Sequence, residues 1–120
     1  PMVYPSHYPP NFNGWKDPNK FPGELIHYVM AAAVKRTNAT SSVFDVIGST
    51  PIASTSPQLY TKEAYDKNKM RPWIQDFDYG GDYGPTEVRE QIQATYDVGL
   101  NSWMIWAPSN IYTRGALLDK

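Results

Sequence analysis

Three short apolar segments alternate with two amphipathic segments along the chain. The apolar segments span residues 2–6, 72–77 and 102–107, and each is followed by residues that favour turns. Near-continuous apolar runs of this length are typical of parallel strands that are covered on both faces. The pattern therefore predicts three strands of one parallel sheet.

The two amphipathic segments, residues 22–38 and 85–98, predict helices. In the first, Leu25, Ile26, Val29 and Met30 recur at helical spacing. The second begins at a proline and is followed by Gly99, a residue that often ends a helix. Its inner face is expected to carry the residues Val88, Ile92, Thr95 and Tyr96.

The order of these elements predicts an α/β fold. Strands that alternate with helices pair in parallel through right-handed crossovers. The expected architecture is a partial (β/α) barrel with about three parallel strands and two main helices, formed by residues 1–120 as a single segment. Residues 40–70, rich in Ser, Thr and Pro, are expected to form a long variable loop. Because so small a sheet has open edges, we expect self-association through them.

Composition excludes several classes of partner and cofactor. The 120 residues carry 11 Lys and Arg against 12 Asp and Glu, so the electrostatic footprint for nucleic acid is missing. The longest apolar stretch, residues 29–34, is too short for a membrane span. With no cysteine, two histidines and no Gly-rich phosphate loop, no cofactor or transition-metal site is expected. The aromatic content, 4 Trp, 9 Tyr and 4 Phe, favours a ligand that stacks on flat rings.

The candidate site follows from the strand ends, because ligands of parallel α/β folds bind where the strands end. Aliphatic Val3, Ile74 and Ile105 are expected to face the helices. The opposite face and the rim then hold the candidate substrate-binding residues, which are Tyr4, Ser6, His7, Tyr8, Gln75, Asp78, Trp106 and Asn110.

Two carboxylates lie at the end of the second predicted strand. Asp76 and Asp78 are candidates for acid–base chemistry, since glycoside hydrolysis commonly needs a pair of carboxylates, and Asp76 is the candidate catalytic residue. The alternative is that one caps the following turn and the other is solvated. With Asp82 they could also hold a cation through oxygen ligands, although the spacing does not match an EF-hand loop.

His7 and Trp106 each allow two interpretations. His7 could contact a sugar hydroxyl or transfer a proton, or it could make a structural hydrogen bond at the surface. Trp106, just before a Pro-Ser-Asn turn, could stack on a ligand or fill the core.

The same segments resemble a known family. The stretches Val3-Tyr4-Pro5-Ser6-His7-Tyr8, Arg71-Pro72-Trp73-Ile74-Gln75-Asp76-Phe77 and Trp103-Met104-Ile105-Trp106-Ala107-Pro108-Ser109-Asn110 resemble the C-terminal part of a bacterial glycoside hydrolase family with a TIM-barrel domain. The resemblance implies the last three strand–helix units of such a barrel, a glycan substrate, and an extracellular or cell-envelope location.

Two functions follow from the resemblance and the aromatic content. The first is a part of a glycoside hydrolase that acts on glycans and is catalytically incomplete alone, because a TIM barrel needs eight strands and about 250 residues. The second is a non-catalytic module that binds oligosaccharide or polysaccharide, or another partner. In the first case Asp76 takes a catalytic position only through its place on the strand.

Overall fold

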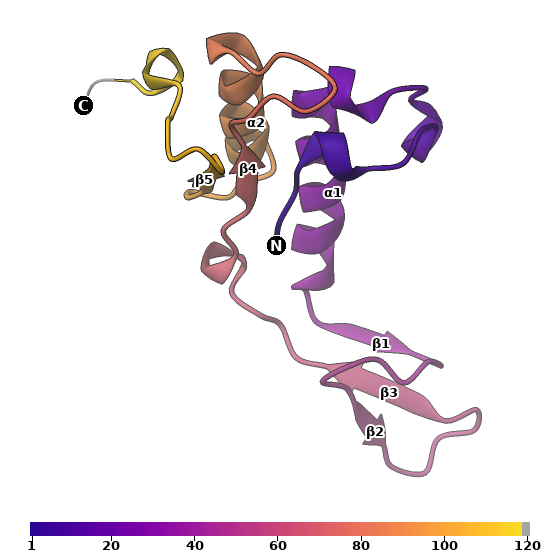
Figure 1. The fold of residues 1–120 in the computed structure, drawn as a ribbon. Coiled ribbons are helices and arrows are strands. Elements are labelled where there is room, and N and C mark those ends of the chain that lie inside the picture. Colours follow the sequence, from indigo (N-terminus) through magenta and orange to yellow (C-terminus); the bar gives the residue numbers. More distant parts are fainter. Residues whose placement is uncertain (119–120) are drawn as a thin grey trace.

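Two helices pack on a small parallel sheet, and a separate antiparallel sheet projects away from them in the computed structural model, which describes residues 1–118 (Figure 1). Helix α1 spans Pro22–Arg36 and helix α2 spans Pro85–Asp97. Strand β4 (Trp73–Gln75) pairs in parallel with β5 (Met104–Trp106). The antiparallel sheet has the order β1-β3-β2, with β1 at Thr40–Ser42, β2 at Thr50–Ile52 and β3 at Leu59–Lys62.

Both helices begin and end at residues that suit helix termini. Each starts with a proline, whose missing N–H would have no partner in the first turn. In α2 the carboxylate of Glu87 accepts a hydrogen bond from the Gly84 N–H at 3.0 Å. Gly99 follows with φ +80°, the left-handed conformation that glycine adopts without strain. The predicted helices are therefore confirmed, with ends one or two residues earlier than expected.

The hydrophobic core lies between the helices and one face of the parallel sheet. Helix α1 contributes Leu25, Ile26 and Met30, and α2 and the sheet contribute the fully buried residues Val88, Ile92, Val3 and Ile74. Burying each such side chain stabilises the fold by about 1.5–3 kcal/mol. Ile105 packs against the same cluster, so the predicted orientation of the aliphatic positions toward the helices is confirmed.

The predicted fold class, a partial (β/α) barrel with about three parallel strands, is wrong. Residues in the predicted long loop form a three-stranded antiparallel sheet, so the fold is mixed α+β. In the part of the chain that the structure describes, only β4 and β5 form a parallel ladder. The first predicted strand is reduced to a single parallel bridge from Met2 to Trp73, and residues 5–7 turn into a 3₁₀ helix.

Proline explains why the first strand stops. Val3 N–H still donates to the Trp73 carbonyl (3.0 Å), but Pro5 has no N–H to donate to the Gln75 carbonyl, the next acceptor on this edge of β4. The fully buried side chain of Gln91, on α2, occupies the position of the missing strand beside Gln75. Its amide accepts from the Gln75 N–H at 2.9 Å and donates to the Gln75 carbonyl at 2.8 Å. One side chain thus satisfies both backbone groups that a neighbouring strand would have paired.

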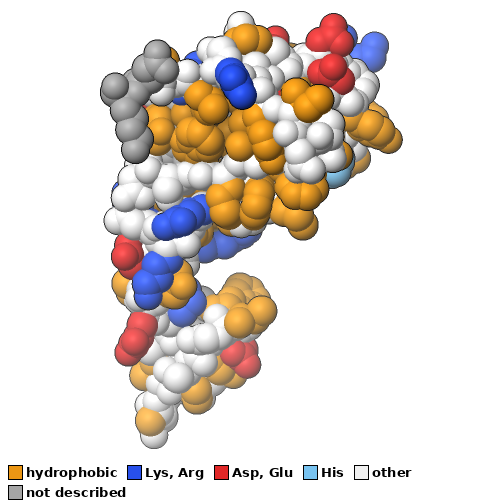
Figure 2. All heavy atoms as spheres, turned by 60° about the vertical axis from the view of Figure 1, so that its left-hand side comes forward, with side chains coloured by type: hydrophobic (Ala, Val, Ile, Leu, Met, Phe, Trp, Pro, Cys, Tyr) orange, Lys and Arg blue, Asp and Glu red, His pale blue; other side chains and the backbone are white. Residues whose placement is uncertain are grey.

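The antiparallel sheet and its connections, residues 38–64, form an arm that extends from the two-helix body (Figure 1). The radius of gyration of 17.5 Å exceeds the roughly 14 Å expected of a compact chain of this length. Hydrophobic side chains gather across the body in Figure 2, and the arm lies below it as a narrower projection. Within residues 1–118, no helix combines the length and the apolar character needed to cross a membrane.

Candidate functional site

An open cleft of about 590 Å³ lies where β4 and β5 end. Its two walls are the loop that follows β4, residues 76–83, and the loop that follows β5, residues 108–113. The residues that line it are Asp76, Phe77, Asp78, Tyr79, Tyr83, Pro108, Ser109, Ile111, Tyr112 and Thr113. The strand-end rule therefore located a cleft even though the barrel was not formed.

The carboxylate of Asp76 joins the two walls of this cleft. Its side chain is buried (4% exposed), and its two oxygens accept hydrogen bonds from the backbone N–H and the hydroxyl of Thr113 at 2.7 and 2.6 Å. Hydrogen bonds to an ionised acceptor are among the stronger ones in proteins. Asp76 therefore fastens the loop after β5 to the end of β4.

Asp78 is exposed and closes the loop after β4. One of its carboxylate oxygens accepts a hydrogen bond from the Tyr83 N–H at 2.7 Å. Tyr83 turns inward, and its hydroxyl donates to the backbone carbonyl of Asn19 at 3.1 Å. Burial, together with the nearby carboxylates of Glu87, Asp17 and Glu90, raises the pKa of the Tyr83 hydroxyl far above its usual value. Tyr83 is therefore a neutral hydrogen-bond donor.

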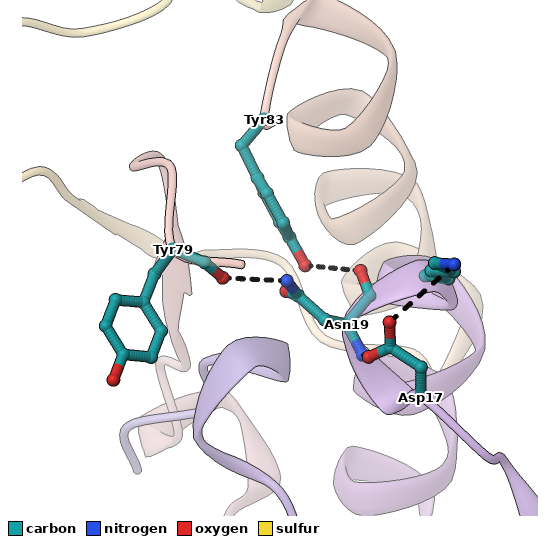
Figure 3. A network of polar contacts seen from close by, with 5 residues as sticks. Asp17, Asn19, Tyr79 and Tyr83 are labelled. Carbon is teal, nitrogen blue, oxygen red and sulfur yellow. Dashed lines mark hydrogen bonds and ion pairs between the residues drawn. The ribbon is translucent and has the colours of Figure 1, made fainter. Parts of the chain in front are cut away.

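Asn19 contacts the loop after β4 and supports it (Figure 3). Its side-chain amide donates to the Tyr79 carbonyl at 2.8 Å, and its Oδ1 is buried without a hydrogen-bond partner. A Cβ on Gly81 would come within 2.9 Å of the Asn19 amide nitrogen. The double glycine after Tyr79 thus leaves room for Asn19, which contacts both ends of the loop.

The other predicted site residues do not line the cleft. Ser6 and Gln75 bind each other, since the Ser6 hydroxyl and N–H both donate to Gln75 Oε1, at 2.8 and 3.1 Å. Trp106 packs edge to face on Trp73 with ring centroids 6.0 Å apart, and remains 41% exposed, so it both packs and presents a surface. Asn110 lies exposed in the loop after β5, but does not line the cleft.

Tyr4, His7 and Tyr8 line a second, smaller hollow. It has a volume of about 370 Å³, and Met2 completes its lining. The His7 ring lies edge to face with the rings of Tyr4 (5.3 Å) and Tyr79 (6.2 Å). Burial raises the pKa of the Tyr4 and Tyr8 hydroxyls. The structure thus places these predicted residues beside the loop that walls the cleft.

Sequence reasoning missed several residues of the cleft. Tyr79 and Tyr112 line it, Thr113 donates to Asp76, and Asn19 supports its wall. Tyr79 carried a weak signal, because an aromatic residue directly before two glycines suggests a ring on a tight loop. Asn19 and Thr113 carried none, since both act across long separations in the sequence.

Among residues 1–118, the structure has no cluster of three or more His, Cys, Asp or Glu side chains suited to a metal ion. The carboxylates of Asp76 and Asp78 are instead engaged by Thr113 and by the Tyr83 N–H.

Residues 1–112 match the family model described as "putative glycosyl hydrolase domain". The match covers most of the chain and includes the whole cleft except Thr113, so the chain belongs to this family. Searches of curated proteins and of solved structures found no significant match.

Proposed function

We propose that the cleft at the ends of β4 and β5 binds a glycan. Membership of a glycosyl hydrolase family supports this substrate class. The exposed rings of Tyr79 and Tyr112, together with the free edge of the Asp78 carboxylate, offer a stacking surface and a hydrogen-bond acceptor in one cleft. Sugar rings have an apolar C–H face and polar hydroxyl edges, which such a lining can contact together.

The chain is proposed to be catalytically incomplete on its own. Hydrolysis of a glycosidic bond usually needs two carboxyl groups about 5–10 Å apart that flank the bond. At this cleft the Asp76 carboxylate is buried and bonded to Thr113, whereas the Asp78 carboxylate is exposed. This single observation favours glycan binding over cleavage by residues 1–118, and it keeps the alternative of a non-catalytic module open.

Titration of the protein with soluble oligosaccharides, followed by calorimetry, tests the proposal. Tyr112→Ala and Tyr79→Ala are expected to weaken binding at least fivefold, because stacking on each ring is lost. Tyr65→Ala is the matched control, since Tyr65 is an exposed tyrosine outside both hollows. Absence of heat from neutral oligosaccharides at millimolar concentration would refute glycan binding. Release of reducing ends by the protein would refute catalytic incompleteness.

Self-association through sheet edges remains a separate proposal. Strands β1 and β2 are the edges of the antiparallel sheet, and β5 lies at an edge of the parallel one. Exposed edges present backbone groups that can pair with another chain. Light scattering after size exclusion is expected to detect a species larger than 13.6 kDa, whereas one monomeric mass at every concentration would overturn the proposal.

A further inference from the structure

The cleft and the smaller hollow are separated by a ridge of aromatic rings. Phe77 and Tyr79 line the cleft, whereas Tyr4 and His7 line the hollow. Ring centroids of Tyr4 and Phe77 lie 5.6 Å apart, those of His7 and Phe77 6.0 Å, and those of His7 and Tyr79 6.2 Å. The two depressions therefore meet at one continuous aromatic surface.

The cleft and the hollow together offer more volume than a single sugar unit fills. The cleft alone, at about 590 Å³, falls within the range of sites that enclose a small ligand, and the hollow adds about 370 Å³ beyond the ridge. Two linked sites raise the affinity for a ligand long enough to occupy both, because the second contact is made within the same complex.

The charge of the lining residues restricts the class of ligand further. The side chains that line the two depressions include the carboxylates of Asp76 and Asp78 and no lysine or arginine. An acidic sugar would meet like charge there and would be repelled. Uncharged sugar units avoid this repulsion.

We infer that the site takes an extended, uncharged oligosaccharide chain, which runs from the cleft across the ridge to the hollow beside His7 and Tyr8. This inference rests on the proposed glycan-binding function and specifies the length and the charge of its ligand. His7 then contacts a sugar unit remote from Asp78 and determines the preference for longer chains.

The test measures affinity against chain length. Cello-, xylo- and malto-oligosaccharides of two to six units are titrated by calorimetry, with oligogalacturonates as the acidic series. In at least one neutral series the affinity is expected to rise tenfold or more between two and six units. His7→Ala is expected to remove most of that rise. His27→Ala is the matched control, because His27 is the exposed histidine of α1.

Each outcome separates this inference from the proposed function. If no oligosaccharide of any length binds, both fail together. If neutral sugars bind with an affinity that is independent of chain length, or that His7→Ala leaves unchanged at six units, the extended site is refuted while glycan binding stands. If oligogalacturonates bind as tightly as neutral chains, the argument from charge is refuted. A melting temperature of His7→Ala equal to that of the parent protein shows that any loss of affinity arises at the site.

Discussion

At the scale of single residues, the contact between Asp76 and Thr113 decides how the cleft is held. We expect Asp76→Asn to lower the free energy of unfolding by about 2 kcal/mol, because charge-assisted hydrogen bonds contribute about 1.5–3 kcal/mol. Thr113→Val removes only the hydroxyl bond and should cost about 1.5 kcal/mol. Urea unfolding followed by tryptophan fluorescence measures both changes.

The double variant distinguishes a shared contact from two independent effects. Side chains in direct contact give stability changes that do not add, so Asp76→Asn combined with Thr113→Val should cost less than the sum of the single changes. Asp82→Asn is the control, since Asp82 is exposed in the loop after β4, and it should change stability by no more than about 0.5 kcal/mol. Strict additivity would contradict the anchoring role of Asp76.

The carboxyl group of Glu90 makes the stability of the folded protein depend on pH. Partial burial and the nearby carboxylates of Glu24 and Glu87 raise the pKa of the Glu90 carboxyl group. A raised pKa in the folded state means that folding favours the protonated form, so this group reduces stability as the pH rises through its folded pKa. Glu90→Gln should therefore melt at a higher temperature than the parent at pH 7.

Thermal melts at pH 7 and near pH 4 measure this effect. The difference in melting temperature between Glu90→Gln and the parent should narrow at the lower pH, where a larger fraction of the glutamate is protonated in both the folded and the unfolded state. Glu63→Gln, at an exposed position in the arm, should behave like the parent at both pH values. If the difference in melting temperature is the same at both pH values, the charge of Glu90 is not the cause of that difference.

At the scale of elements, one glutamine replaces a strand. Gln91→Met keeps the length of the side chain but leaves the N–H and the carbonyl of Gln75 buried without partners. Each unsatisfied group costs about 1–3 kcal/mol, so the variant should lose about 3 kcal/mol of unfolding free energy. Gln93→Met on the exposed face of α2 is the matched control and should change stability little. Equal stability of the two variants in urea would refute the role given to Gln91.

The sequence predicted the body of the protein better than its connections. Periodic apolar residues such as Leu25, Ile26 and Ile92 located both helices and the core, because burial of a stripe dominates the stability of a helix. The parallel pairing of β4 with β5 was also predicted correctly. The sheet of the arm was missed because its strands are three or four residues long and lie among Ser, Thr, Gly and Pro residues that favour turns.

The sequence indicated that Asp76 and Asp78 lie at the end of a strand, but it did not indicate what surrounds them. Asp76 and Asp78 do line a cleft, since their place at a strand end follows from local pattern. The partners that give them their environment, Thr113 and Tyr83, approach through loops whose paths no local pattern specifies. The buried role of Gln91 was likewise not predicted, because periodicity alone cannot show that a backbone gap needs filling.

At the scale of the whole molecule, the arm is structurally separate from the core. Every residue from 38 to 70 is at least partly exposed, so the three-stranded sheet has no buried core of its own. Sheets of this size without a hydrophobic face are only marginally stable. The ends of the arm nevertheless meet, because the Tyr65 N–H donates to the Thr37 carbonyl at 2.6 Å. The chain thus leaves the body at one end of the arm and returns to it at nearly the same point.

Replacing residues 40–62 with a short Gly-Asn-Gly linker should therefore leave the body folded. The meeting of Thr37 and Tyr65 means that few residues are needed to close the gap, and a shorter loop lowers the entropy cost of closure slightly. The variant should unfold in one cooperative transition with a midpoint within a few degrees of the parent, and it should bind oligosaccharides with unchanged affinity.

In the parent, limited proteolysis should cut first within residues 43–58. Loss of cooperative unfolding in the shortened chain would show that the body depends on the arm, and a loss of sugar affinity alone would place part of the binding surface on it.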